Sequence, residues 1–384
     1  MKRLQALFLD KSGRKTASPY SGYCFGGCAL FAGMCLQLSF ALALEGTTKS
    51  FPAVGPESVR LAIHGATDLS AMEPLIRDFQ LTAPGIAIDY SDFVTNDLQK
   101  SASEACSAGA GQGDILLSSS LDQLVKLSND GCAVPHLSAE TARVADWAKW
   151  RDEVFGFTYE PTVFVYNARF VPPADVPRTH VELADLLRRR LDYYRGRIGT
   201  FDIRLSGVGY LLAFSDAAQP TTVYGRLLES MSRAEVEVRC CTGASLQEIA
   251  SGRLYIGYNM IGSYAYAAAR SNPDLKVVVP RDYTLILSRG ALIPKTSAHR
   301  DLAGRFLDYL LSERGREMAR EHAFFFSEDG PLPRGVDGPA VLNESTGAQP
   351  IHIGPALLAA QDEAQRNRFI QDWSRSMIYV APRD

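Results

Sequence analysis

Short apolar runs alternate with amphipathic stretches through the first part of the chain. Three runs rich in aliphatic and β-branched residues predict strands, at 59–63, 86–90 and 114–117. Three stretches with apolar residues at helical spacing predict helices, at 72–81, 96–105 and 121–127. Strands and helices that alternate at this spacing are typical of a parallel sheet joined by crossover helices.

A second alternation follows a long β-rich stretch at 155–167. Helices are predicted at 181–190, from 206 onward, and at 223–232, 245–251 and 264–270, and strands at 197–200, 254–258, 276–279 and 284–293. Amphipathic helices follow at 299–311 and 313–322, then a loop-like stretch at 325–349 and a helical end at 355–377.

This order predicts an α/β protein with two lobes, each a mainly parallel sheet flanked by helices, and a hinge between them. We assign 44–160 to lobe 1 and 161–283 to lobe 2. The chain is expected to return to lobe 1 with its helices over 284–330, and 331–384 form a C-terminal tail.

Residues 1–43 resemble a secretory leader. A basic head that contains Lys2 and Arg3 precedes an apolar run at 23–40, and Ala41-Leu42-Ala43 is a small-x-small cleavage pattern. We predict a cleavable signal peptide without a lipid anchor, and therefore a periplasmic protein. The alternative is an uncleaved membrane anchor, because the apolar run is nearly long enough to span a bilayer.

The charge of the mature chain argues against a nucleic-acid partner. The whole chain carries −3 and the predicted leader +4, so the mature chain carries −7. Enzyme motifs are missing as well: there is no Gly-x-Ser-x-Gly and no His-Glu-x-x-His, and the six histidines are scattered. We predict a protein that is not an enzyme and that needs no cofactor.

Four cysteines remain after the leader, namely Cys106, Cys132, Cys240 and Cys241. An even number in an exported protein suggests disulfides, and four cysteines allow three pairings. Cys106 and Cys132 flank one strand–helix unit that a bridge could close, so a bridge between them is preferred. A bridge between the neighbours Cys240 and Cys241 is expected to strain the peptide that joins them.

Small, hydroxyl-rich loops follow several of the predicted strands. Thr67 lies in the loop after the first strand, and Ser119 and Ser120 follow the third. Ligands bind beyond the carboxyl ends of strands in parallel sheets. Ser206 and Gly207 open a helix whose free N–H groups suit an anion, although an ordinary helix cap accounts for the same residues.

Several segments, in this order along the chain, resemble a known family. They are 114–122, 164–167, 206–209, 252–264, 291–294 and 306–316, with Ile353-Gly354-Pro355 and Phe369-x-x-x-Trp373 in the tail. Over almost all of 59–322 the chain is similar to bacterial extracellular solute-binding proteins of ABC transporters, of the ferric-ion and organic-anion type. Within them it most resembles the phosphoglycerate transport regulatory protein group.

The resemblance implies a type II periplasmic-binding-protein fold that closes on a small solute. Its partner is expected to be an ABC permease, a membrane sensor kinase or both, and the protein itself is expected to be a monomer. Ferric-binding relatives carry adjacent tyrosines, whereas Ala265 separates Tyr264 from Tyr266 here. Because Fe³⁺ needs several anionic oxygens, a phosphorylated or carboxylated organic anion is the favoured ligand, with Fe³⁺ as an alternative.

Helix N-termini from both lobes are then expected to meet around the anion. The residues expected to bind it are Thr67, Ser119, Ser120, Asp202, Arg204, Ser206, Gly207, Asn259, Ser263 and Tyr264. Alternatives stay open for three of them. Arg204 can pair with Asp202 or face solvent, Asn259 can cap a turn, and Tyr264 can pack between the lobes.

Overall fold

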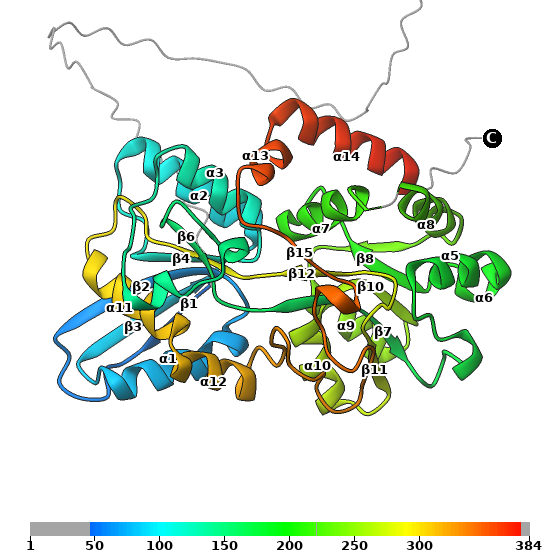
Figure 1. Cartoon of the computed structure of the whole chain (residues 1–384), viewed down its shortest axis with the longest axis horizontal. Helices are drawn as coiled ribbons and strands as arrows, with labels where there is room; N and C mark the ends of the chain where they lie inside the picture. The colour runs from blue at the N-terminus through cyan, green and yellow to red at the C-terminus, as the bar shows by residue number, and fades with distance from the viewer. Residues whose placement is uncertain (1–46, 220, 378–384) are drawn as a thin grey trace, which may run out of the picture. The chain divides into compact units, whose positions relative to one another are not determined.

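Residues 47–219 and 221–377 are described by the structure, which is a computed structural model (Figure 1). The predicted leader at 1–43 lies outside the described residues. None of the helices within the described ranges has the length and apolar character needed to cross a bilayer.

Lobe 1 is built on a seven-stranded sheet in the order β1-β3-β2-β4-β13-β6-β5. Its strands are β1 (Thr47–Phe51), β2 (Val59–Ala66), β3 (Ile86–Asp92), β4 (Ile115–Ser118), β5 (Lys149–Trp150), β6 (Val154–Gly156) and β13 (Gly290–Leu292). Its helices are α1 (Leu69–Thr82), α2 (Thr95–Ala108), α3 (Leu121–Asn129), α4 (Ala139–Ala142), η1 (Asp146–Ala148), α11 (Arg300–Leu311) and α12 (Glu313–His322). β2, β3 and β4 are parallel as predicted, but the other strands of the sheet pair antiparallel, so the sheet is mixed and not mainly parallel as we expected.

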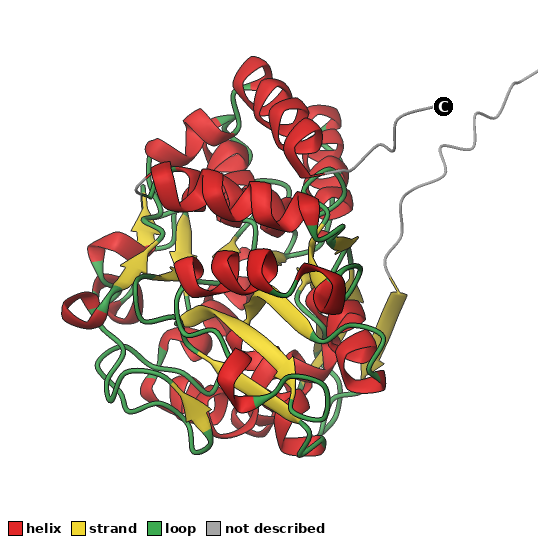
Figure 2. Cartoon of the chain, turned by 90° about the vertical axis from the view of Figure 1, so that its right-hand side faces the viewer, coloured by secondary structure: helices red, strands yellow, loops and turns green. Residues whose placement is uncertain are grey.

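Lobe 2 is built on an eight-stranded sheet in the order β14-β11-β7-β10-β8-β9, with β12 pairing both β7 and β15. Its strands are β7 (Glu160–Asn167), β8 (Ile198–Phe201), β9 (Glu237–Arg239), β10 (Ile256–Ile261), β11 (Leu275–Val278), β12 (Thr284–Leu287), β14 (Val336–Asp337) and β15 (Ala348–Pro350). Its helices are η2 (Pro173–Asp175), α5 (His180–Arg189), α6 (Leu191–Tyr194), α7 (Gly207–Ala217), α8 (Thr221–Arg233), α9 (Thr242–Ser251), α10 (Gly262–Ser271) and η3 (Glu344–Thr346). Figure 2 shows helices above and below these strands.

The chain passes between the two sheets three times, and the first two crossings, from β6 to β7 and from β12 to β13, are neighbours, whereas the third follows α12 and leads to β14. The stretch predicted as one strand at 284–293 is two strands, because β12 pairs in lobe 2 and β13 in lobe 1. Ser288 and Arg289 join them and lie beside the crossing from β6 to β7. The Arg289 N–H donates to Thr158 Oγ1 at 2.8 Å, and the Phe157 N–H donates to the Arg289 carbonyl at 2.9 Å. The two crossings therefore hold each other in place.

The tail packs against both lobes. Its helices α13 (Ala356–Ala360) and α14 (Glu363–Met377) replace the single helical end predicted at 355–377. α13 contacts α3 of lobe 1 and α14 contacts α8 of lobe 2. The Tyr210 hydroxyl on α7 donates to the Ala360 carbonyl at 2.6 Å, and the Gln361 side chain donates to Asp122 on α3. Figure 1 shows both helices running along one side of the lobes.

Both remaining cysteine pairs are bridged. Cys106 and Cys132 are bonded with their Cα atoms 5.5 Å apart, which confirms the preferred pairing. Cys240 and Cys241 are also bonded, contrary to our expectation. Cys240 and Cys241 lie in the turn between β9 and α9. Because Cys106 and Cys132 are bonded to each other in lobe 1, the described residues offer each of these two cysteines no other partner than its neighbour.

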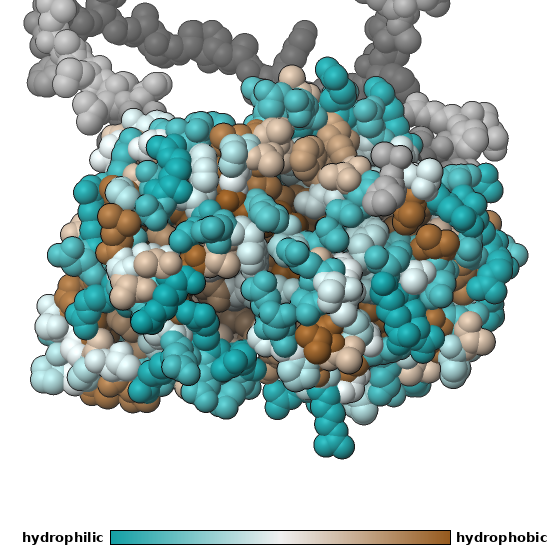
Figure 3. Space-filling model, in the orientation of Figure 1, coloured by the Kyte–Doolittle hydropathy of each residue, from teal (hydrophilic) through white to brown (hydrophobic). Residues whose placement is uncertain are grey.

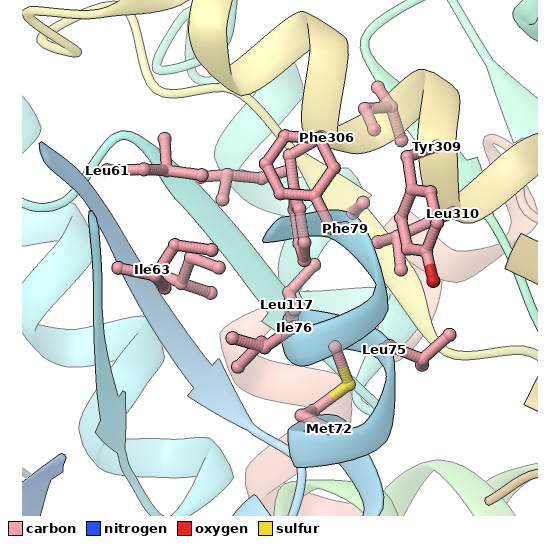
Figure 4. Packing of buried hydrophobic residues seen from close by; sticks show 14 of the residues in the cluster. Leu61, Ile63, Met72, Leu75, Ile76, Phe79, Leu117, Phe306, Tyr309 and Leu310 are labelled. Atoms are coloured by element: carbon pink, nitrogen blue, oxygen red, sulfur yellow. The ribbon is translucent and has the colours of Figure 1, made fainter. Parts of the chain in front are cut away.

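The core of lobe 1 explains why α1 forms where it does. Met72, Leu75, Ile76 and Phe79 recur at helical spacing and are almost fully buried against the sheet. Figure 4 shows these side chains packed with residues of β2 and α11. Phe79 meets the Phe306 ring edge-on, with centroids 5.0 Å apart. Burial of this apolar face, rather than intrinsic propensity, stabilises the helix.

Truncation of Phe79 is therefore expected to be costly. Phe79→Ala should lower the free energy of unfolding by about 3–5 kcal/mol, because a ring that is 2% exposed leaves a cavity. The measurement is denaturant unfolding of both proteins. Leu81→Ala on the same helix is the control, since Leu81 is 65% exposed and should change stability by less than about 0.5 kcal/mol. Equal losses in the two variants would contradict this account of the core.

Candidate ligand-binding site

A cavity of about 280 Å³ lies between the lobes, where strands of both sheets end. Lobe 1 lines it with Ala66, Asp68, Asp92, Phe93, Val94, Thr95 and Ser119. Lobe 2 lines it with Phe201, Ser206, Val208, Cys240, Cys241, Thr242, Gly243, Ile261 and Tyr264, and Arg289 comes from the crossing segment. We call this cavity the cleft.

A second cavity, of about 390 Å³, shares no lining residue with the cleft. It is bounded by α12, by the segment that follows α12 and by the crossing from β6 to β7, with Phe157, Tyr159 and Phe324 among its walls. Figure 3 shows an apolar recess in the lower middle of this face, above the position of α12 in Figure 1. The cleft, in contrast, lies at the carboxyl ends of the parallel strands β2, β3, β8 and β10, where ligands bind in such sheets, so the cleft is the candidate site.

Arg289 is the central cation of the cleft. It is 1% exposed, its Nε donates to Glu160 Oε1 at 3.1 Å, and its Nη1 donates to Thr67 Oγ1 at 3.1 Å. The guanidinium also lies between two aromatic rings, 4.6 Å from the Tyr264 centroid and 5.0 Å from that of Phe324. Nη2 is buried and has no hydrogen-bond partner among the described residues. A buried amino group without a partner is costly, because no hydrogen bond offsets the loss of its contact with water.

Glu160 is held in turn by Ser263. The Ser263 hydroxyl donates to Glu160 Oε1 at 2.8 Å, and the Ser263 N–H donates to Oε2 at 3.2 Å. Thr67 and Ser263 are both fully buried and do not line the cleft. Both residues were predicted to bind the ligand. In the structure they hydrogen-bond to the Arg289–Glu160 pair and hold it in position.

Tyr264 joins the two lobes across the cleft. Its hydroxyl accepts a hydrogen bond from the Asp68 N–H at 3.0 Å. Burial raises the pKa of Tyr264 well above its ordinary value, so the phenol is neutral at physiological pH. Tyr264 therefore lines the cleft, as expected, and also packs between the lobes, which was the alternative.

Two carboxylates line the cleft on the lobe 1 side, Asp68 and Asp92. Asp92 Oδ2 accepts from the Leu69 N–H at 3.3 Å. Burial, and to a smaller extent the charge of Asp68, raise the pKa of Asp92 to about 6. Both groups can accept hydrogen bonds from hydroxyl or ammonium groups, so the cleft suits a ligand that carries such donors beside its anionic group.

The start of α7 is a cap rather than an open anion site. Ser206 lines the cleft, but its hydroxyl accepts from the Gly209 N–H at 3.1 Å. The Gly207 N–H donates to Thr95 Oγ1 of lobe 1 at 2.9 Å. Ser120 is fully buried, so Ser119 alone of the predicted serine pair lines the cleft.

Three further predicted residues lie outside the cleft. Arg204 Nη2 donates to Asp202 Oδ2 at 2.6 Å, which is the alternative pairing considered from the sequence. The Asn259 amide donates to the buried Asp216 at 2.6 Å inside lobe 2, and its φ of 59° marks a left-handed turn. Of the ten predicted residues, Ser119, Ser206 and Tyr264 line the cleft.

Arg289, Asp92 and the Cys240–Cys241 bridge line the cleft but were not predicted from the sequence. A signal for Arg289 was present, because it is the one charged residue in the largely apolar run 284–294. Such a residue is buried only when it is paired or bound, which marks it as a candidate for function. Asp92 directly ends the second strand of the parallel unit and could have been found by its position.

Residues 63–325 match the sequence profile of a family described as bacterial extracellular solute-binding protein. A substrate-binding protein of an ABC transporter from Agrobacterium tumefaciens is 32% identical in sequence, with a TM-score of 0.79. That similarity covers 87% of this chain and 99% of the other. The chain belongs to the bacterial extracellular solute-binding proteins.

Two more distant solved structures share the fold of this solute-binding protein. Iron-bound HitA from Pseudomonas aeruginosa is 18% identical, with a TM-score of 0.63, and the match covers 82% of this chain and 99% of that one. AfuA from Actinobacillus pleuropneumoniae, with fructose-6-phosphate bound, is 16% identical with a TM-score of 0.64, covering 84% and 99%. No curated protein matches the sequence.

The expected type II fold is confirmed by these comparisons. Membership of the family also makes solute binding for ABC transport the general role of the protein, and such proteins are generally not enzymes. The finer resemblance to the phosphoglycerate transport regulatory group stays a prediction.

Asp92 should make the stability of the ligand-free protein depend on pH. Between about pH 4 and pH 6 the folded state binds more protons than the unfolded state, because the pKa of Asp92 rises from 3.8 to about 6 on folding. The contribution of Asp92 to the free energy of unfolding should therefore fall as pH rises through this window, in parallel with that of the buried Asp122, whose pKa burial also raises to about 6. Asp92→Asn should remove the Asp92 contribution, which makes the dependence on pH shallower, and should stabilise the protein near pH 7.5 by about 1–2 kcal/mol.

Urea unfolding at several pH values measures this effect. Asp146→Asn is the control, since the Asp146 side chain is fully exposed and should leave the pH profile unchanged. A profile of Asp92→Asn that matches the unmodified protein would contradict the raised pKa.

Proposed function

We propose that this solute-binding protein captures a small phosphorylated or carboxylated organic anion in the cleft and delivers it to an ABC permease. The observation that carries the proposal is the buried Arg289 Nη2, which lacks a partner among the described residues. A guanidinium binds carboxylate or phosphate with strong, directional hydrogen bonds. The fructose-6-phosphate bound to AfuA supports the proposal by analogy of fold.

The two carboxylates of the cleft restrict the class of ligand further. Asp68 and Asp92 would repel a bare anion, but they accept hydrogen bonds from hydroxyl groups. A ligand with an anionic group at Arg289 and hydroxyl groups toward these carboxylates satisfies both sides of the cleft. The predicted leader and the periplasmic location that it implies fit this role. A membrane sensor kinase is the alternative partner for the loaded protein.

Direct Fe³⁺ binding is the second candidate, because Asp68, Asp92 and Tyr264 are hard oxygen donors in one cavity. The iron bound to HitA, which shares this fold, supports this candidate by analogy. Two observations rank it lower. The raised pKa of Tyr264 disfavours the phenolate, and the described part of the chain has no group of three or more His, Cys, Asp or Glu side chains that could hold a metal ion.

A thermal-shift panel tests the proposal on protein that was unfolded and refolded to remove carried-over solute. The panel holds phosphoglycerates, sugar phosphates, phosphonates, di- and tricarboxylates, inorganic phosphate, and Fe³⁺ with and without citrate. A ligand at about 100 times its Kd adds about 2.7 kcal/mol of stability, which raises Tm by several degrees. One or more organic anions should give this shift, whereas a shift with Fe³⁺ alone would refute the proposal.

Arg289→Lys should weaken binding of that anion by about 10-fold to 100-fold, because lysine keeps the charge but loses the directed Nη2 hydrogen bond. Isothermal titration calorimetry gives the Kd of each protein. Arg281→Lys is the matched control, since Arg281 pairs with Asp337 at the surface outside the cleft. Equal affinities of the two variants for the anion would show that Arg289 does not bind it.

Tyr264→Phe separates the two candidates. Removal of the hydroxyl deletes the hydrogen bond from the Asp68 N–H and should weaken anion binding only modestly, by less than about tenfold. Fe³⁺ binding through the phenolate would instead be lost, together with any visible charge-transfer absorbance. Loss of iron binding with no effect on anions would therefore favour the ferric candidate.

A further inference from the structure

The Cys240–Cys241 bridge lies in the wall of the cleft. Both cysteines line the cavity, and they are bonded to each other in the turn between β9 and α9. Both are half-buried, so their surfaces are available to a bound molecule. A bridge between neighbouring residues closes a small ring through the peptide bond, which leaves this part of the wall little freedom to move.

Charge is distributed unequally around the cleft. Its charged side chains are Asp68, Asp92 and Arg289, which come from lobe 1 and from the crossing segment. Lobe 2 contributes no charged residue to the lining among the described residues. Beside the bridge, its wall presents the apolar side chains of Val208 and Ile261 together with the hydroxyl residues Ser206, Thr242 and Tyr264. The cleft therefore has one charged side and one uncharged side, and the bridge belongs to the apolar part of the uncharged side.

The sulfur atoms reinforce this apolar part. A disulfide offers no N–H or O–H donor, and its sulfurs are polarizable and make favourable contacts with C–H groups and rings. A ligand that fits both sides needs an anionic group and hydroxyls on one face and carbon on the other. The cleft volume of about 280 Å³ lies at the lower end for small-molecule sites, which suits one molecule of sugar size.

We infer that the Cys240–Cys241 disulfide is a specificity-determining wall that packs against the carbon skeleton of the bound anion and selects a phosphorylated sugar over inorganic phosphate. This inference rests on the proposed function and adds the ligand class and the residues that select it. Arg289 binds the anionic group, the aspartates accept sugar hydroxyls, and the disulfide contacts the C–H face.

The test compares two paired variants of the full chain, exported into an oxidising compartment. Cys240→Ser with Cys241→Ser removes the vicinal bridge, and Cys106→Ser with Cys132→Ser removes the other bridge, which does not line the cleft. Calorimetric titrations use two probes, fructose 6-phosphate and inorganic phosphate. Peptide mapping first establishes which disulfides each protein contains, and a Cys240–Cys241 dithiol in the oxidised unmodified protein would overturn the inference.

Loss of the vicinal bridge should weaken fructose 6-phosphate binding by about tenfold or more, the scale of a lost apolar contact in a pocket. Inorganic phosphate lacks a carbon skeleton, so its Kd should stay within about twofold. The control variant should bind both probes as the unmodified protein does.

Reduction provides a second route to the same change without substitution at the cleft. In the Cys106→Ser, Cys132→Ser variant the vicinal bridge is the remaining disulfide among the described residues. Dithiothreitol gives it two electrons and two protons, yielding two thiols, and itself closes to a cyclic disulfide. Fructose 6-phosphate affinity should fall as in the serine variant and recover after the reductant is removed and oxidised glutathione is added.

The remaining outcomes separate the two proposals. Unchanged fructose 6-phosphate affinity without the bridge overturns this inference and leaves the proposed anion site intact. An equal loss for both probes also overturns it, because the bridge would then only hold the start of α9 in place. Failure of the unmodified protein to bind either probe overturns the phosphorylated-sugar assignment, and the wider ligand panel then decides the proposed function.

Discussion

The buried ion pair between Arg289 and Glu160 is the interaction on which the arrangement of the cleft depends. Each residue is 1% exposed, so the pair carries a large desolvation cost that only close hydrogen bonds offset. Thr67 and Ser263 supply those bonds from opposite lobes, and Tyr264 and Phe324 enclose the guanidinium. The pair thus ties the lobes together at the point where the chain crosses between them, and it leaves the Nη2 amino group without a partner among the described residues.

Around this pair the lobes meet through specific polar contacts. The Asp68 N–H of lobe 1 donates to the Tyr264 hydroxyl of lobe 2, and the Gly207 N–H of lobe 2 donates to Thr95 of lobe 1. The Gly207 N–H at the start of α7, which was predicted to bind an anion, therefore bonds to the other lobe. The tail adds a third connection through α13 and α14. These contacts are the ones that a movement of the lobes away from each other would break.

The division of the cleft into a charged and an uncharged, partly apolar side gives it more selectivity than an anion site alone. An isolated cation binds any small anion, whereas carboxylates beside it reject ligands without hydrogen-bond donors. A rigid apolar wall opposite them rejects ligands without a carbon face. The same cleft can therefore discriminate among solutes that share one anionic group, which is what a solute-binding protein requires.

The sequence by itself determined the local features. The periodicity of apolar residues predicted the β2–α1–β3–α2–β4–α3 unit. Ser206 was recognised as a possible helix cap, and it caps α7. The positions of Cys106 and Cys132 suited the bridge that joins them. Only the tertiary structure decided which polar groups reach the cleft. Arg289 lies more than two hundred residues from Thr67, and such pairings depend on lobe packing, which periodicity does not encode. For the same reason Ser263 and Asn259 turned inward to buried carboxylates, although their local sequence suits a ligand site equally well.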